Sequence, residues 1–272
     1  MDIENIIASV VKEVMNQIDT KCHSPNMASS AVTAQDIAKM IDHSLLRPQL
    51  SKQEVEEGCR LAKQYDCATV CVKPCDVELA YNILKDTDVK VTTVIGFPHG
   101  AHLTAVKVME AQLAMSQGCT ELDLVINIGR LKSGDHDYVE KDVTAVVEAA
   151  HARGVLVKVI FENAYLTEDE IVTACRICEK AGADWVKTST GFAPTGATIK
   201  DLKLMRKTCS ARVQVKAAGG VRTLDNALSV RAVGCTRFGA TATKVIIEEA
   251  RNRERSGTLR LPDVVKEMSD KY

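Results

Sequence analysis

The chain has 272 residues, of which 46% are hydrophobic and 26% are charged, and its formal net charge is -1. A chain of this length can bury one sizeable core, and α/β barrels commonly occupy it as a single domain. The balance of charge provides no broad positive field, so nucleic acid is not an expected partner.

Residues 1–19 are predicted to form a short amphipathic helix. Apolar residues recur there at the spacing i, i+3, i+4 and i+7, opposite a polar face. Residues 20–32 follow as a predicted flexible linker, because TKCHSPNMASSA is rich in Ser, Pro and Asn. A helix this short is only marginally stable in isolation. Its apolar stripe is therefore expected to bind a partner.

Three partners are considered for this helix. The pattern resembles the encapsulation peptides that carry enzymes into bacterial microcompartments by binding shell proteins or each other. The helix can instead fold back on the rest of the chain or across a dimer interface. A membrane is disfavoured because the polar face carries Lys12 against Asp2, Glu4 and Glu13. The same acidic residues argue against a secretory signal, and no run approaches the ~20 apolar residues of a membrane span. We therefore expect a cytoplasmic protein, with a microcompartment interior as the further hypothesis.

Residues 33–255 are predicted to form one (β/α)8 TIM barrel. Apolar strand-like runs alternate there with helical patterns, which is typical of a parallel sheet covered by helices. The eight expected strands are a short run at 44–46, then 68–74, 90–97, 121–127, 155–162, 184–190, 213–220 and 236–241. The alternative is a doubly wound open sheet, but no GxGxxG or GxxxxGK[ST] motif follows any strand. Residues 256–272 are expected to be a C-terminal tail.

Helix boundaries are marked by capping residues. Ser51 with Glu54 predicts a capping box for a helix over 51–65. Thr167 with Glu170 repeats the signal for a helix over 167–183, and Gly182 marks its end. A further helix is expected over 223–234.

Ten cysteines are scattered along the chain. Cys175 and Cys178 have CxxC spacing, but they lie within a helical pattern and no second CxxC follows. Zinc requires about four suitably spaced ligands, so buried free thiols are the preferred interpretation. We expect no metal, and the absence of an export signal indicates a reducing compartment.

Charged residues interrupt three of the predicted strands: Asp123, Lys187 and Lys216. Strand alternation can turn all three into the barrel, where each is explained either as a buried ion pair or as part of a site. Gly219-Gly220 follows the seventh strand and Gly239-Ala240-Thr241 the eighth, the two positions where barrels commonly hold a phosphate. Their joint occurrence favours a site over isolated ion pairs.

Lys187 ends an apolar run in ADWVKTSTGF (183–192). A buried lysine is costly unless it is paired. Either its ammonium reaches the rim of the barrel, or it is desolvated so that the amine loses its proton and becomes a nucleophile.

Seven segments, in order over about residues 33–250, resemble the deoxyribose-phosphate aldolase family. They are IDHSLLRP (41–48), TVCVKP (69–74), VTTVIGFPHG (91–100), ELDLVINIG (121–129), GADWVKTSTGF (182–192), VKAAGGVRT (215–223) and RFGAT (237–241). The resemblance implies a Schiff-base (class I) aldolase on a (β/α)8 barrel, without metal or cofactor. Its reaction is the reversible cleavage of 2-deoxy-D-ribose 5-phosphate to D-glyceraldehyde 3-phosphate and acetaldehyde. A homodimer is expected from the resemblance alone.

The resemblance also assigns roles to residues. The imine-forming lysine falls on Lys187, the second lysine on Lys216 and the catalytic aspartate on Asp123. Asp42 either completes the proton relay or simply caps or pairs at the barrel mouth. The phosphate would rest on Gly219, Gly220, Gly239, Ala240 and Thr241. Thr190 is expected to line the sugar path, and Cys71 to lie beside the site as a packed residue rather than a nucleophile.

Some residues depart from the family pattern. The phosphate loop reads GATAT (239–243) where relatives often carry GxSS, so Ala242 lacks a hydroxyl donor. A related Schiff-base aldolase acting on another phosphorylated sugar therefore stays open. An inactive barrel that serves as a microcompartment-associated binding protein is a third hypothesis, against which the intact Asp123, Lys187 and Lys216 argue. His99 is interpreted as a rim residue, and Tyr272 as a disordered end or a phenol that reaches the site.

Overall fold

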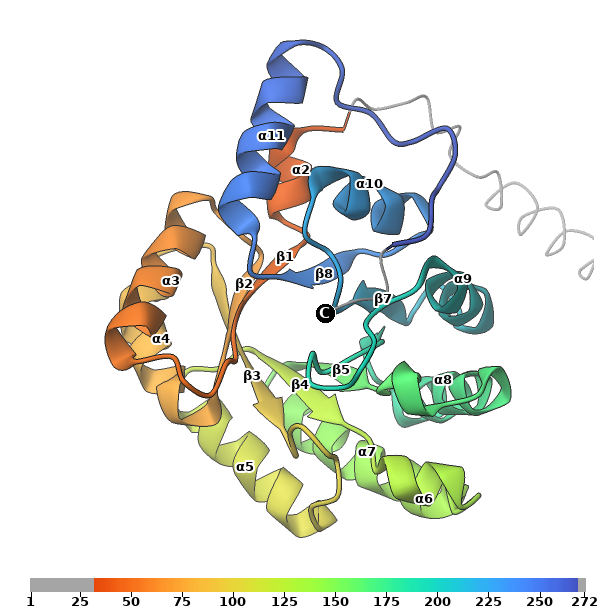
Figure 1. Cartoon of the computed structure of the whole chain (residues 1–272). Coiled ribbons are helices and arrows are strands. Elements are labelled where there is room, and N and C mark those ends of the chain that lie inside the picture. The colour runs from red at the N-terminus through yellow and green to blue at the C-terminus, as the bar shows by residue number, and fades with distance from the viewer. Residues whose placement is uncertain (1–31, 269–272) are drawn as a thin grey trace, which may run out of the picture. The chain divides into compact units, whose positions relative to one another are not determined.

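The computed structural model describes residues 32–268, and they contain a closed barrel of eight parallel strands in the order β1 to β8 (Figure 1). The strands are β1 (Ile41–Leu45), β2 (Thr69–Val72), β3 (Lys90–Ile95), β4 (Glu121–Val125), β5 (Leu156–Ile160), β6 (Trp185–Lys187), β7 (Gln214–Ala217) and β8 (Arg237–Ala240). β8 pairs with β1 and closes the sheet. The predicted (β/α)8 fold is confirmed, and the open doubly wound sheet is excluded.

Seven of the eight predicted strands contain the observed strand, starting at most one residue before it and ending one to three residues after it. The first strand differs more. It begins at Ile41, three residues before the predicted start, and so includes Asp42 and His43. Both polar side chains are buried, 1% and 5% exposed, because partners inside the fold satisfy them.

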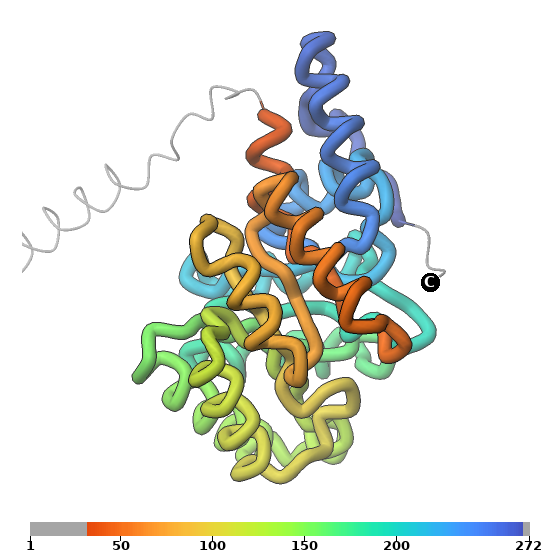
Figure 2. The backbone as a smooth tube through the Cα atoms, turned by 90° about the vertical axis from the view of Figure 1, so that its left-hand side faces the viewer, coloured from red at the N-terminus to blue at the C-terminus, as the bar shows by residue number. Residues whose placement is uncertain are grey.

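Helices surround the barrel. They are α2 (Ala34–Ala38), α3 (Lys52–Gln64), α4 (Val77–Leu84), α5 (Thr104–Ser116), α6 (Ile128–Lys132), α7 (His136–His151), α8 (Glu168–Ala181), α9 (Ile199–Thr208), α10 (Leu224–Ala232) and α11 (Thr243–Arg255). Two short 3-10 turns occur at Pro74–Asp76 and Asn163–Tyr165. In Figure 2 the helices near the viewer run beside one another along the barrel.

The predicted capping residues begin the helices as expected. Ser51 with Glu54 forms a capping box on α3, and Thr167 with Glu170 forms one on α8. Gly182 ends α8 with a φ of 83°, a conformation that glycine adopts at little cost. The third predicted helix is α10, capped by the Thr223 side chain.

The ring of helices closes where the first and last described helices meet. α2 lies beside α11 in Figures 1 and 2, and Ala34 N donates a hydrogen bond to Glu254 Oε1 at 3.2 Å. The described residues after α11 contain neither helix nor strand, yet Leu259 and Met268 are buried. Glu267 Oε2 also accepts a hydrogen bond from Ile199 N at 2.9 Å.

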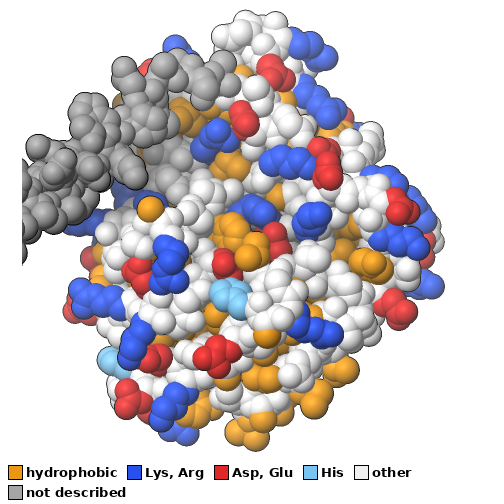
Figure 3. Space-filling model, turned by 180° about the vertical axis from the view of Figure 1, so that it is seen from behind, with side chains coloured by type: hydrophobic (Ala, Val, Ile, Leu, Met, Phe, Trp, Pro, Cys, Tyr) orange, Lys and Arg blue, Asp and Glu red, His pale blue; other side chains and the backbone are white. Residues whose placement is uncertain are grey.

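The described residues from Thr33 to Met268 belong to one compact unit. The predicted helix over 1–19, nearly all of the linker and Tyr272 lie outside the described residues, so the predicted boundaries there stay predictions. Within 32–268 no helix has the length and apolar character that a membrane crossing requires. On the face shown in Figure 3, acidic and basic side chains of the described residues lie interspersed.

Candidate active site

A cavity of about 250 Å³ opens at the carboxyl ends of the strands, the end at which barrel enzymes carry their sites. Ten of the eleven residues predicted for the site line it, and Asp123 lies just below. The lining residues are Asp42, Ser44, Leu46, Arg47, Cys71, Lys187, Thr190, Gly191, Phe192, Lys216, Ala218, Gly219, Gly220, Val221, Arg222, Gly239, Ala240 and Thr241.

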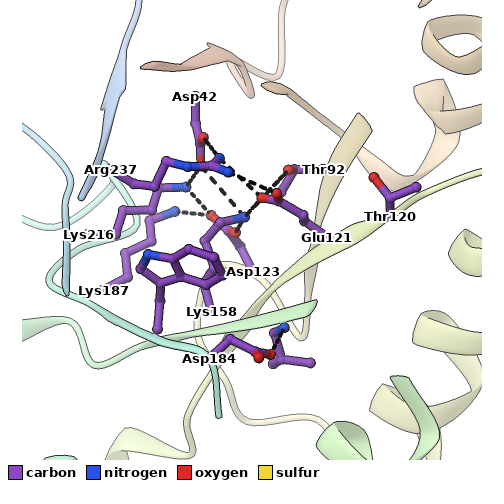
Figure 4. Close-up of polar contacts among 12 residues, drawn as sticks. Asp42, Thr92, Thr120, Glu121, Asp123, Lys158, Asp184, Lys187, Lys216 and Arg237 are labelled. Carbon is purple, nitrogen blue, oxygen red and sulfur yellow. Dashed lines mark hydrogen bonds and ion pairs between the residues drawn. The ribbon is translucent and has the colours of Figure 1, made fainter. Parts of the chain in front are cut away.

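Two lysines meet one carboxylate at the floor of this cavity. Lys187 Nζ and Lys216 Nζ each lie 2.7 Å from Asp123 Oδ2. Figure 4 shows both lysine side chains reaching toward Asp123 from neighbouring strands. Lys187 and Lys216 occupy the same level because β6 and β7 pair them in register, and both lysines and Asp123 are at most 3% exposed as whole residues.

Further charges support this pair. Lys216 also contacts Asp42, whose other oxygen accepts from Arg237 at 2.8 Å. Lys158 Nζ lies 3.0 Å from Asp123 Oδ1 and 2.5 Å from Glu121 Oε2. Lys158, Glu121 and Arg237 are not among the residues predicted for the site from the sequence.

The cluster holds four basic side chains, Lys158, Lys187, Lys216 and Arg237, and three carboxylates, Asp42, Glu121 and Asp123. With all seven ionised the cluster carries one excess positive charge in a buried setting, which is unfavourable. A neutral amine at one lysine restores the balance of three against three.

Of the three lysines, Lys187 is the one whose surroundings favour the neutral amine. Burial lowers the pKa of Lys187, and the cation of Lys216 lowers it further, against the opposing effect of Asp123. For Lys216, burial also acts to lower the pKa, but Asp123 and Asp42 together raise it above its ordinary value. Lys158 follows the same logic, since Asp123, Glu121 and Asp42 outweigh its burial and raise its pKa.

The carboxylates respond in the opposite sense. Burial alone would raise the pKa of Asp123, but Lys158, Lys187 and Lys216 hold it well below its ordinary value. Burial likewise opposes ionisation of Asp42, whose pKa Lys216, Lys158 and Arg237 lower. Asp42 therefore lies in β1 as a buried ion paired with Lys216 and Arg237, an arrangement open both to the relay role and to the purely structural pairing.

Cys71 is a packed residue beside the cluster. It contacts Leu46 and Val94 in a small apolar group and is 2% exposed. Burial, with Asp123 nearby, raises the pKa of its thiol to about 12, so the thiolate is disfavoured at neutral pH.

The loops predicted for phosphate binding line the same cavity as the two lysines. Gly219 and Gly220 have φ values of 80° and 92°, which favour glycine. The GATAT segment leads directly into α11. No side chain caps the first turn of this helix, so its first backbone N–H groups have no side-chain acceptor. Arg47 and Arg222 also line the cavity.

Among the described residues, Cys175, Cys178 and His99 do not line the cavity. Cys175 and Cys178 are buried free thiols within α8. His99 is exposed, as expected of a rim residue. Within residues 32–268, no three His, Cys, Asp or Glu side chains are grouped so as to hold a metal ion.

Comparison with known proteins decides the family. Residues 14–245 match the model of the DeoC/LacD family aldolases. The chain belongs to this aldolase family. Curated relatives named deoxyribose-phosphate aldolase include one from Thermoanaerobacter sp. (strain X514), 54% identical over 79% of this chain and 96% of its own, and one from Thermococcus gammatolerans, 51% identical over 80% and 98%.

Solved structures agree with the family assignment. An aldolase called QR15 is 40% identical, with a TM-score of 0.77 over 81% of this chain and 98% of its own. The deoxyribose-phosphate aldolase of Aeropyrum pernix, described as a unique tetramer, is 29% identical, with a TM-score of 0.75 over 80% and 92%.

Two further charged residues of this aldolase, Lys158 and Arg237, also lie within predicted strands. Lys158 lies between valines in VLVKVIFE, the same kind of signal that selected Lys187. Arg237 begins the last strand. Glu162 ends the same predicted strand as Lys158, but its backbone is left-handed, with a φ of 59°, and the sequence gives no sign of that conformation at a residue other than glycine.

Proposed function

We propose that this protein reversibly cleaves 2-deoxy-D-ribose 5-phosphate to D-glyceraldehyde 3-phosphate and acetaldehyde through a Schiff base on Lys187. The main support is the position of Lys187 in a chain of the DeoC/LacD aldolase family. Lys187 is buried at the floor of a cavity, its pKa is lowered, and its Nζ lies 2.7 Å from Asp123 Oδ2. Relatives about half identical in sequence and named deoxyribose-phosphate aldolase support the choice of substrate.

The proposed reaction begins with attack of the neutral Lys187 amine on C1 of the open-chain aldehyde. Loss of water gives a protonated imine, an electron sink for the next step. Removal of the proton from the C3 hydroxyl breaks the C2–C3 bond, and its electrons pass to an enamine. Protonation of C2 and hydrolysis release acetaldehyde and regenerate the amine.

Asp123 and Lys216 are proposed to move the protons. Asp123 contacts both lysines through one oxygen, so it can pass a proton between the carbinolamine and Lys216. Asp42 is proposed to complete the relay, since it contacts Lys216 from the opposite side. Arg237 and Lys158 hold Asp42 and Asp123 in place and keep them ionised.

The substrate phosphate is proposed to bind the backbone of Gly219, Gly220, Gly239, Ala240 and Thr241. The free N–H groups at the start of α11 favour an anion there. Arg47 and Arg222 add positive charge to the same cavity. Thr190 and Cys71 are proposed to line the sugar path.

Substrate comparison tests this assignment. Purified protein is expected to release D-glyceraldehyde 3-phosphate from 2-deoxyribose 5-phosphate with a kcat/KM at least about 100-fold above that for unphosphorylated 2-deoxyribose, because the phosphate supplies binding energy. A preference for a different phosphorylated sugar would replace the proposed substrate and leave the aldolase chemistry intact.

Lys216→Met is expected to shift the acidic limb of the kcat/KM profile to higher pH. The Lys216 cation lowers the pKa of Lys187, so its removal raises that pKa and a more alkaline solution is needed to free the amine. The rate at the optimum is expected to fall about 100-fold or more as well, through loss of the relay. A pH profile that keeps its acidic limb in place, or moves it to lower pH, would contradict this role.

The protein is also proposed to self-associate as a homodimer. Exposed apolar residues share one face of α5, namely Val106, Met109 and Leu113, with Leu103 just before the helix. Apolar side chains gather along the lower edge of the molecule in Figure 3. In Figure 1, α5 also lies at the lower end of the molecule. The Aeropyrum pernix relative is described as a tetramer, so assembly occurs among relatives.

Charge placed on this face is expected to separate the subunits. Met109→Glu combined with Leu113→Glu should give the mass of a monomer by light scattering, where the native chain gives a dimer, because the buried apolar area is replaced by carboxylates. Val245→Glu, at an exposed apolar position on α11, is the matched control and should stay dimeric. A monomeric native chain, or a dimeric double variant, would contradict the proposal.

Residues 1–19 are proposed to bind a microcompartment shell protein and place the enzyme inside a microcompartment. The support is the amphipathic pattern of the sequence and the reactivity of acetaldehyde. Residues 1–32 fused to a fluorescent protein should collect in the microcompartments of a cell that makes them. A fusion that stays evenly distributed would leave packing against the barrel or a second subunit as the better explanation.

A further inference from the structure

Glu162 is a buried carboxylate that the proposed reaction does not use. It follows β5, is 3% exposed, and has φ 59° and ψ 62°. A residue other than glycine is uncommon in this left-handed region, and such strain persists where surrounding contacts enforce it. Backbone hydrogen bonds of the residues before and after Glu162 enforce its conformation. Phe161 N donates to Lys187 O at 3.0 Å, and Asn163 N donates to Thr188 O at 2.9 Å.

The carboxylate of Glu162 holds the loop that follows the Schiff-base candidate. Its Oε1 accepts from Thr190 N at 3.1 Å, and its Oε2 accepts from the Thr190 hydroxyl. The same hydroxyl oxygen accepts from Phe192 N at 3.1 Å. Thr190 lines the cavity three residues after Lys187, so Glu162 acts on the site through Thr190.

These contacts determine what the Thr190 hydroxyl can offer a ligand. A hydroxyl has one proton and two acceptor lone pairs. The proton is directed to Glu162 and one lone pair to Phe192 N–H, which leaves one lone pair for the cavity. Thr190 therefore presents an acceptor and no donor, which suits a sugar hydroxyl and disfavours a phosphate oxygen.

We propose that Glu162 is a positioning residue that fixes Thr190 as a hydrogen-bond acceptor for a hydroxyl of the sugar substrate. The sugar chain then lies along Thr190 after β6, and the phosphate is directed to the adjacent loop after β7, at Gly219 and Gly220. This inference rests on the proposed function, because it assumes a polyhydroxylated phosphate substrate with its aldehyde at Lys187.

Glu162→Gln tests the inference with little change of shape. The amide oxygen can still accept from Thr190 N, but the amide N–H₂ donates to the Thr190 hydroxyl oxygen and releases its proton toward the cavity. We expect kcat/KM for 2-deoxyribose 5-phosphate to fall about 10- to 100-fold, mostly through KM. Borohydride trapping of acetaldehyde on Lys187 should stay at the native level, because acetaldehyde has no hydroxyl.

Glu170→Gln is the matched control. Glu170 also accepts from a threonine, Thr167 N at 2.7 Å, but it caps α8 outside the cavity. Its kinetics are expected to equal those of the native protein. Circular dichroism melting of both variants reports whether a loss of activity reflects a loss of folding.

A double-mutant cycle with Thr190→Val separates a positioning role from a purely structural one. Thr190→Val alone should lower kcat/KM by a factor similar to that of Glu162→Gln. If Glu162→Gln does not fold, Thr190→Val alone tests the role of the Thr190 hydroxyl. Adding Glu162→Gln to Thr190→Val should then change kcat/KM by less than about twofold, because both act through one hydroxyl.

Several results would overturn the inference. They are additive effects in the cycle, native kinetics in either single variant, or loss of acetaldehyde trapping in a folded Glu162→Gln. A native protein that traps acetaldehyde but cleaves no 2-deoxyribose 5-phosphate would refute the proposed substrate, and the inference with it. Native cleavage combined with unchanged variants refutes the inference alone.

Discussion

Lys187→Met is expected to abolish cleavage of 2-deoxyribose 5-phosphate, with kcat falling by at least about three orders of magnitude. Methionine fills a similar volume but has no amine, so no covalent intermediate can form. The fold should survive, because removal of the Lys187 amine leaves no carboxylate without a partner. Asp123 keeps Lys216 at 2.7 Å and Lys158 at 3.0 Å.

Two measurements accompany this prediction. A coupled assay for D-glyceraldehyde 3-phosphate reports the rate, and thermal melting reports the fold. Lys200→Met, which removes an exposed lysine at the start of α9, is the matched control and should cleave at the native rate. Residual activity above about one per cent of native in a folded Lys187→Met would argue against a nucleophilic role.

Asp123→Asn is expected to lower kcat by about 10²- to 10⁴-fold. The amide is nearly isosteric but cannot take up the proton that the relay requires. Because Asp123 raises the pKa of Lys187, its loss leaves the amine at least as free of its proton as before. A drop in activity therefore reports loss of proton transfer and not protonation of the nucleophile.

The same substitution is expected to destabilise the fold. Lys216 and Lys158 lose the carboxylate that lies 2.7 and 3.0 Å from them, and breaking a buried pair typically costs about 3–5 kcal/mol. Rates are therefore measured below the melting transition of the variant. An Asp123→Asn protein with native rates would remove Asp123 from the reaction and leave it as a structural ion partner.

The barrel was predictable because its signals are local. Apolar runs and helix caps depend on residues close together in the sequence, such as Ser51 and Glu54 in the capping box of α3. The start of β1 was missed because Asp42 and His43 do not look like strand residues until Lys216, Arg237 and Thr243 are placed beside them. Those partners lie about 170 to 200 residues away in sequence.

The site was predictable in part. A charge in an apolar strand pointed to Asp123, Lys187 and Lys216. Lys158 carried the same signal, but its contacts with Glu121 and Asp123 depend on the register of β4 and β5. The balance of charge that favours a neutral Lys187 appears only when all seven groups are counted together in space.

The role of Glu162 could not be found from the sequence. Its position depends on a left-handed turn at a glutamate and on hydrogen bonds to a loop 28 residues further along the chain. Neither feature leaves a local pattern.

The most direct test of the account is the intact mass of the protein after incubation with acetaldehyde and sodium borohydride. The account predicts a gain of one reduced ethyl group on the native chain, located on Lys187 by peptide mapping, and no gain on Lys187→Met. No adduct on the native chain, or an equal adduct on the variant, would contradict the Schiff base and leave Lys187 as a member of a buried ion network.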